Sequence, residues 1–341
     1  MKKFSALFLS LMMILSIAGC SGASESSSVA DTQQSASSGS GEVDAYNVSG
    51  NLVMGTAAST GTFYYVGAAI GNAVSDAGKL NVLVQATAGS NENVSMAQSG
   101  DIDIGMANCD ALWGAYNGEL AYKDAGKQDI QLVAALYYSQ LHVMVTEKSG
   151  ITDISQLKGK RVCVGSQGTS YLYINEVILN EYGITLADID PYYMNYAEAA
   201  EALANGDIDA AFQTGGYPIA GIQQTAATTA FRFLPLSDEI VGTVTQKYPF
   251  AVKTTIPADT YENQANDSEI STLGYLTCLF TSSKADNDQI YAFVKLMMES
   301  LDTYKNTNNS TMQISPETVA TEFIPFNEGA ARYYREAGLM D

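Results

Sequence analysis

The stretches SGDIDIGMAN (Ser99–Asn108) and NGDIDAAFQT (Asn205–Thr214) place the same four residues, Gly-Asp-Ile-Asp, at two points of the chain. In each copy an Ala-containing segment precedes the glycine and an apolar run follows it. A glycine between such segments is typical of a helix that ends just before a core strand begins. We therefore expect Gly100 and Gly206 to end two helices at equivalent positions of two similar α/β lobes.

Runs with strand and helix character alternate on both sides of these copies. Phe63, Val66, Ile70 and Val74 have helical spacing in a segment that Gly78 should close, and residues 170–183 predict a helix that ends at Gly183. Apolar or alternating runs predict strands at 51–56, 79–87, 102–108, 131–138, 141–146 and 160–165. This alternation predicts an α/β fold with parallel sheets, which bind ligands at the carboxyl ends of their strands. The two lobes should therefore face one another across a ligand cleft.

The composition is acidic. The chain has 341 residues, and 17 Lys+Arg against 37 Asp+Glu give a formal net charge of −20. Such a chain repels nucleic acid and anionic membrane surfaces, so neither is an expected partner. Beyond the N-terminal segment its cysteines are Cys109, Cys163 and Cys278, without a C-x-x-C or Cys/His spacing. We interpret all three as structural, and we expect no metal and no cofactor.

The N-terminus has the pattern of a targeting segment. Lys2 and Lys3 precede an apolar run that is too short to span a membrane, and small residues follow it. Ile17–Cys20 resembles the bacterial lipobox, which predicts cleavage after residue 19 and a lipid on Cys20. The Ser/Gly/Ala/Gln-rich segment 21–45 predicts a flexible tether. These features predict a protein outside the cytoplasm that contacts the cell membrane only through the Cys20 lipid.

Five segments at predicted strand-to-helix junctions are rich in Gly, Ser and Thr and contain no Lys or Arg: 55–65, 87–93, 108–113, 165–171 and 214–218. Backbone N–H groups and hydroxyls at such junctions can hold an anion. Glu92 and Asp110 could instead meet an amino group. An amino acid or a small dicarboxylate suits this inventory, and so does a neutral polar ligand. Helix capping alone would also account for any single Ser or Thr among them.

Seven blocks of the sequence together resemble the solute receptors of TRAP transporters of the TAXI type. The resemblance runs in family order across nearly all of the chain beyond the tether. The blocks are GTAASTGTFYYVGAAI, VQATAGSNENVSMAQSGDIDIGMAN, GAYNGE, LVAALYYSQLHVMV, DISQLKGKRVCVGSQGTS, YPFAVKTTIPADTY and IPFNEGAARYYREAGL.

This resemblance implies a two-lobed periplasmic-binding-protein fold of type II, with a hinge and an interlobe cleft. Lobe 1 would comprise residues 46–141 and 255–341, and lobe 2 residues 142–254. It implies capture of a glutamate-like amino acid or a dicarboxylate, delivery to an ion-gradient-driven TRAP permease, and no catalysis. The ligand contacts that it implies are Thr56, Ser59, Thr60, Thr62, Tyr64, Ser90, Asn93, Asn108, Ser166, Thr169, Ser170, Gln213 and Tyr217.

The chain also departs from the family pattern. Ala57 and Ala58 stand where the glycine-rich opening loop of the family has glycines, and Tyr171 replaces a usually small residue. The extra atoms could narrow the site or change which ligand fits.

Other functions remain open at this point. The same fold could serve an ABC transporter or a sensor, or the chain could be an adhesive surface protein without a small ligand. An enzyme is the remaining rival, but His142, the one histidine of the sequence, lies in an apolar run that favours a buried structural role. We expect a monomer without enzymatic activity.

Overall fold

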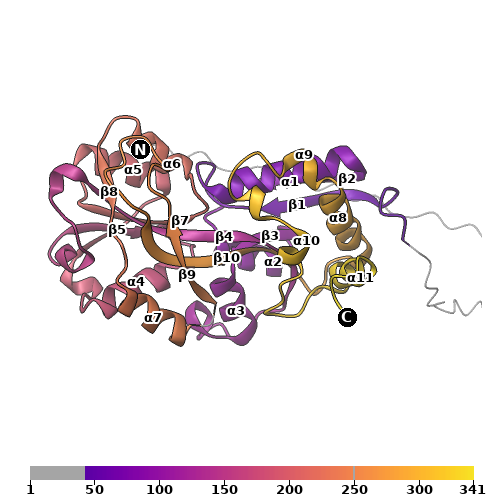
Figure 1. Cartoon of the computed structure of the whole chain (residues 1–341). Coiled ribbons are helices and arrows are strands. Elements are labelled where there is room, and N and C mark those ends of the chain that lie inside the picture. Colours follow the sequence, from indigo (N-terminus) through magenta and orange to yellow (C-terminus); the bar gives the residue numbers. More distant parts are fainter. Residues whose placement is uncertain (1–42, 249) are drawn as a thin grey trace, which may run out of the picture. The chain divides into compact units, whose positions relative to one another are not determined.

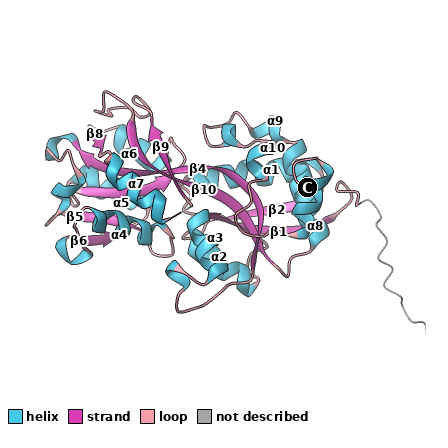
Figure 2. Ribbon diagram, turned by 60° about the horizontal axis from the view of Figure 1, so that its bottom comes forward, coloured by secondary structure: helices cyan, strands magenta, loops and turns pink. Residues whose placement is uncertain are grey.

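The computed structural model describes residues 43–248 and 250–341. The predicted signal peptide, the predicted lipid attachment site at Cys20 and nearly all of the predicted tether lie outside the described residues. Residues from Val43 onward form one compact unit built on a ten-stranded mixed sheet with helices on its faces (Figures 1 and 2). None of the helices in the described ranges has the length and apolar character needed to cross a bilayer.

The sheet has the order β2-β1-β3-β10-β4-β7-β5-β6, with β8 paired to β4 and β9 paired to β10. Its strands are β1 (Ser49–Gly55), β2 (Lys79–Gln85), β3 (Ile104–Asn108), β4 (Ile130–Thr146), β5 (Arg161–Gly165), β6 (Asp190–Tyr193), β7 (Ala210–Gly215), β8 (Phe231–Phe233), β9 (Ala251–Ile256) and β10 (Ile270–Ser282).

Two long antiparallel strands, β4 and β10, connect the two ends of this sheet. The first part of β4 pairs with β10, and its last residues pair with β7 and β8. We call β1, β2 and β3 with their helices the first half, and β5 to β8 with theirs the second half. Within each half the neighbours β1, β2 and β3, or β5, β6 and β7, are parallel. The lobe boundaries at 141/142 and 254/255 stay a prediction.

From β1 to α3 and again from β5 to α7, the α-helices alternate with the strands, as the sequence predicts. They are α1 (Thr62–Ala77), α2 (Ser90–Ser99), α3 (Cys109–Asn117), α4 (Tyr171–Glu181), α5 (Tyr196–Asn205), α6 (Ala220–Ala226), α7 (Asp238–Lys247), α8 (Asn287–Glu299), α9 (Leu301–Tyr304), α10 (Pro316–Val319) and α11 (Glu328–Glu336). In the first half α1 packs on β2 and α8, and α11 packs on α8. In the second half α5 packs on α6 and α4 on α7.

The two repeated glycines, Gly100 and Gly206, end helices, as the sequence predicts. Gly100 caps α2 with φ 83° and Gly206 caps α5 with φ 81°, both in the left-handed region that favours glycine. The core strands β3 and β7 follow, and every residue in them is buried. Cys109, Cys163 and Cys278 are buried and not joined in disulfides.

Details of the elements differ from the sequence-based prediction. The predicted strands 131–138 and 141–146 are one strand, β4, because Gln140 pairs with both Gly274 of β10 and Gly215 of β7, and extended backbone continues between them. The strand predicted from residue 102 begins at Ile104. Gly78 does end α1, but its φ of −142° is extended.

Close packing explains the glycine at position 78. A Cβ atom there would lie 2.6 Å from Cδ1 of Leu296 on α8. Glycine is therefore favoured at position 78 because α8 packs closely against it, and not because the backbone is left-handed there.

Candidate ligand-binding site

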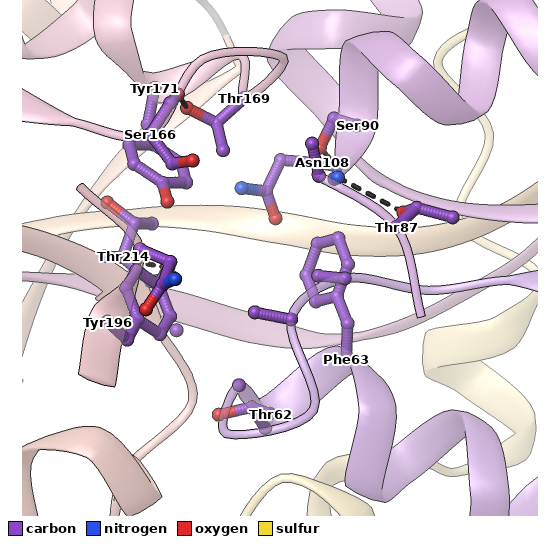
Figure 3. A pocket seen from close by; sticks show the side chains of 17 residues that line it. Thr62, Phe63, Thr87, Ser90, Asn108, Ser166, Thr169, Tyr171, Tyr196 and Thr214 are labelled. Atoms are coloured by element: carbon purple, nitrogen blue, oxygen red, sulfur yellow. Dashed lines mark hydrogen bonds between the residues drawn. The ribbon is translucent and has the colours of Figure 1, made fainter. Parts of the chain in front are cut away.

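A cavity of about 330 Å³ lies where the carboxyl ends of strands from both halves meet (Figure 3). Small-molecule sites usually measure about 300–1,000 Å³, so this one suits a small ligand. Its wall consists of Ala57, Ala58, Gly61, Thr62, Phe63, Thr87, Ala88, Gly89, Ser90, Asn108, Ser166, Thr169, Tyr171, Asn195, Tyr196, Thr214 and Gly215.

The start of α1 forms one part of the wall. Gly61 is the N-cap residue, and no side chain caps the helix. The first N–H groups of a helix have no partner inside it, and they carry a partial positive charge. Thr62 and Phe63 stand at this helix start beside the cavity (Figure 3), so their N–H groups are suited to an anionic atom.

Asn108, at the end of β3, projects its amide toward the middle of the cavity (Figure 3). Its backbone N–H donates to Oγ of Ser90 at 3.2 Å, and its Oδ1 accepts from Oγ1 of Thr277 at 3.1 Å. Thr277 is in turn 2.7 Å from Oγ of Ser139. These bonds fix the orientation of the amide and leave its Nδ2 group without an acceptor among the described residues.

Two tyrosines form the wall on the second half. The rings of Tyr171 and Tyr196 stack with centroids 6.3 Å apart at 29°. The Tyr196 hydroxyl donates to the carbonyl oxygen of Thr214 and accepts from the Thr214 N–H at 3.3 Å. Oγ1 of Thr214 is buried and has no hydrogen-bond partner among the described residues. A hydroxyl in this state is a ready partner for a polar ligand atom.

The two halves touch on two sides of the cavity. On one side Oγ1 of Thr62 donates to the carbonyl oxygen of Gly216 at 2.7 Å. On the other, the N–H groups of Asn91 and Glu92 donate to the carbonyl oxygen of Gly168 at 3.0 and 3.3 Å. The Ser170 hydroxyl also donates to Oδ1 of Asp110 across the halves, at 3.0 Å. These contacts join the two halves on both sides of the cavity.

No ionisable acid or base lines this cavity apart from its two tyrosines. Asp110, the nearest carboxyl in sequence to Asn108, is 3% exposed and does not line the cavity. Burial raises the pKa of the Asp110 carboxyl to about 6. Residues 43–248 and 250–341 contain no cluster of three or more His, Cys, Asp or Glu that could hold a metal ion.

His142 lies away from this wall. It is fully buried between the rings of Phe233 and Tyr261, and its Nδ1 is 2.9 Å from the carbonyl oxygen of Gln140. Burial lowers the pKa of its imidazole to about 4. A neutral, enclosed imidazole is suited to the structural role that the sequence favours.

Five of the residues predicted from the sequence as ligand contacts meet in the cavity wall: Thr62, Ser90, Asn108, Ser166 and Thr169. Their contact with a ligand stays a prediction. The other predicted residues are not in the wall: Thr56, Ser59, Thr60, Tyr64, Asn93, Ser170, Gln213 and Tyr217.

Several of the predicted residues that are not in the wall make hydrogen bonds within the protein. Thr56 donates from Oγ1 to the carbonyl oxygen of Gln85 at 2.8 Å. Asn93 donates from Nδ2 to the carbonyl oxygens of Thr56 and Met106, both at 2.7 Å. Ser170 binds Asp110 as described above. Tyr217 lines a neighbouring cavity of about 230 Å³.

Two wall residues were not predicted from the sequence: Asn195, the N-cap of α5, and Tyr196, its first residue. The sequence pattern could have indicated them, because they lie at a strand-to-helix junction like those of the five segments described above. Phe63, Thr87, Tyr171, Thr214 and Gly215 lie within those segments and were not selected. Their place in the wall depends on which side of each loop faces the opposite half.

Comparison with known proteins agrees with this architecture. A family model described as NMT1-like matches residues 54–338. A solved structure from Bordetella bronchiseptica RB50 has a TM-score of 0.53 at 16% identity, over 84% of this chain and 98% of that one. A structure described as a periplasmic transporter has a TM-score of 0.52 at 16% identity, over 84% of this chain and 92% of that one.

The periplasmic sulfonate-binding protein SsuA of Methylobacillus flagellatus KT, described as part of a sulfonate ABC transporter, is a more distant likeness. Its TM-score is 0.44 at 17% identity, over 84% of this chain and 78% of that one. The mixed α/β architecture is that of periplasmic-binding-protein-like folds, as the sequence predicted.

Proposed function

This chain belongs to the NMT1-like family, and on that premise we propose that it is an extracytoplasmic receptor for a small carboxylate solute. The observation that carries the proposal is the cavity between the two halves, with neutral donors from both in its wall. Such a site can hold a solute without transforming it, because no acid, base or nucleophile is placed for chemistry beside the hydroxyls and amides. The receptor would act without a cofactor.

The partner of such a receptor is a membrane transporter. The blocks of sequence described first suggest a TRAP permease, whereas the family match is to an NMT1-like model and carries no TRAP assignment. The transporter that we propose as the partner is therefore of the ABC type, and a TRAP permease is the second candidate. Co-purification of the chain with the membrane components encoded beside its gene would separate them, since an ATPase subunit belongs only to the ABC type.

The N-terminal segment supports attachment to the outside of the cell membrane. Cleavage before Cys20 and lipidation of its thiol would leave the folded unit on a tether. Metabolic labelling with a fatty-acid analogue tests this, because a Cys20→Ala chain should lose the label and a Cys109→Ala chain should keep it.

Motion of the two halves about β4 and β10 would admit the solute. The inter-half contacts at Gly168 and Gly216 are few and polar, which suits a closed state that can reopen. We expect Ser90, Asn108, Ser166 and Thr169 to contact the bound solute.

Thermal melting of the full chain with amino acids, dicarboxylates and monocarboxylates tests the receptor function. A solute that binds only the folded protein must raise Tm by mass action. We expect a rise with at least one carboxylate and a smaller rise in a Tyr196→Ala variant. If Tm does not change with any solute, and mass spectrometry of the denatured protein finds no co-purified small molecule, the proposal is wrong.

A further inference from the structure

We infer that the cavity selects an organic acid with one ionised group and an apolar or aromatic body, in preference to dicarboxylates and zwitterionic amino acids. This inference rests on the proposed receptor function and narrows its ligand. It departs from the glutamate-like or dicarboxylate ligand that the sequence led us to expect.

The first step concerns charge. The cavity wall contains no Lys, Arg, His, Asp or Glu side chain. An ion that leaves water for such a site must be matched by counter-charge or by hydrogen bonds. One carboxylate can be matched by the neutral donors described next, but each further ion would need another full set of hydrogen bonds, because the wall holds no counter-charge.

The second step concerns the donors that would hold the single carboxylate. Asn108 is 2% exposed, and its Nδ2 group points into the cavity without an acceptor among the described residues (Figure 3). Thr214 is 4% exposed, and its buried Oγ1 lacks a partner within the described chain. The uncapped start of the 16-residue helix α1 adds N–H groups at Thr62 and Phe63. A carboxylate accepts several such bonds with its two oxygens.

The third step concerns the rest of the ligand. Phe63, Tyr171 and Tyr196 present rings to the cavity (Figure 3), and Ala57 and Ala58 also line it. The Tyr171 and Tyr196 rings stack at 29° with centroids 6.3 Å apart, and with Phe63 they give this part of the wall an aromatic surface. Such a surface gains free energy by covering hydrocarbon.

Titration calorimetry of the full chain with matched acids tests the inference. The linear set is hexanoate, adipate, 6-aminohexanoate and hexanamide, and the aromatic pair is 3-phenylpropanoate and phenylalanine. In at least one set we expect the simple monocarboxylate to bind roughly tenfold or more tightly than each analogue with a further charge. We also expect hexanamide to bind more weakly than hexanoate.

A charge placed in the wall gives an independent test. Asn108→Asp keeps the shape of the side chain and the acceptor for Thr277, and it should weaken binding of the monocarboxylate roughly tenfold at neutral pH. Asn81→Asp, at an exposed position of β2, is the control and should leave Kd unchanged. If Asn108→Asp does not fold, Thr214→Val serves instead, with Thr321→Val as its control, and we expect a several-fold loss.

The outcomes separate this inference from the receptor function. Tighter binding of adipate, 6-aminohexanoate or phenylalanine than of the matched monocarboxylate overturns the inference and leaves a receptor for another solute. Binding by dicarboxylates or amino acids of the wider panel, with none by any monocarboxylate, overturns it as well. If no solute binds and none co-purifies, both proposals fail.

Discussion

The backbone N–H of Asn91 donates a hydrogen bond to the carbonyl oxygen of Gly168 at 3.0 Å. Asn91 belongs to the first turn of α2 in the first half, and Gly168 to the loop before α4 in the second. The Asn91 side chain adds a second bond, from Nδ2 to the carbonyl oxygen of Thr169 at 3.1 Å. A helix start that would otherwise bind solvent is therefore satisfied by the opposite half, which favours the closed arrangement.

Gly168→Ala should weaken solute binding by disturbing this contact. Gly168 has φ +83°, and a Cβ atom there would lie 2.9 Å from Cβ of Ala88 in the opposite half. The closed state would then be penalised, and we expect Kd to rise roughly tenfold by calorimetry. Gly183→Ala is the matched control, since Gly183 has φ +71° and open space around it. Each variant bears about 1 kcal/mol of backbone strain, so equal Kd values would contradict the prediction.

Asp110→Asn should reduce the loss of folding stability that the protein shows as pH rises. Burial raises the pKa of Asp110 to about 6, above its value in the unfolded chain, so the folded state binds the proton more tightly. The wild type should lose stability as pH rises from about 4 to about 6, by about 3 kcal/mol from this group. The amide removes that loss and retains an oxygen to accept from Ser170. Urea unfolding at pH 4.5 and pH 7.5 checks this, and parallel pH dependence in the two proteins would rule it out.

His142 should remain neutral in the folded protein down to about pH 4. Burial lowers the pKa of its imidazole to that value, and the folded state therefore binds fewer protons than the unfolded state between about pH 4 and 6.5. Stability that is fully present above pH 6.5 should decline as pH falls toward 4, by about 3 kcal/mol from this group. Since the sequence has one histidine, the imidazole signal in an NMR titration reports it directly. A midpoint near 6.5 in the folded protein would disprove the prediction.

Asn93→Ala should reduce stability and leave solute affinity of the folded protein unchanged. Its Nδ2 group donates to two backbone carbonyls, and its side chain is fully buried. Loss of both bonds should lower the free energy of unfolding by about 2–4 kcal/mol in urea titrations. Asn81→Ala, which removes an exposed amide on β2, should cost much less. A large rise in Kd for Asn93→Ala at full folding would restore the ligand-contact role that the sequence suggested.

The sequence by itself determined the alternation of the elements and the repeat at the centre of each half. Gly100 and Gly206 could be assigned from local pattern alone, because a left-handed helix cap needs a residue without Cβ and both lie between a helix-like and a strand-like run. The same holds for the loops that supply the cavity wall, since strand-to-helix junctions are local features that meet at one edge of a parallel sheet.

Only the tertiary structure decided which side chains in those loops face the cavity. Thr214 and Gln213 are neighbours on β7, so their side chains point to opposite faces of the sheet. Thr214 lines the cavity that forms against the opposite half, and Gln213 does not. Asn93 and Ser170 are polar residues at helix starts like Ser90, yet they bind Met106 and Asp110 within the protein. The pairing of Asn91 with Gly168 joins residues 77 positions apart. Such contacts depend on how two separately encoded halves meet, and no local pattern of residues specifies that geometry.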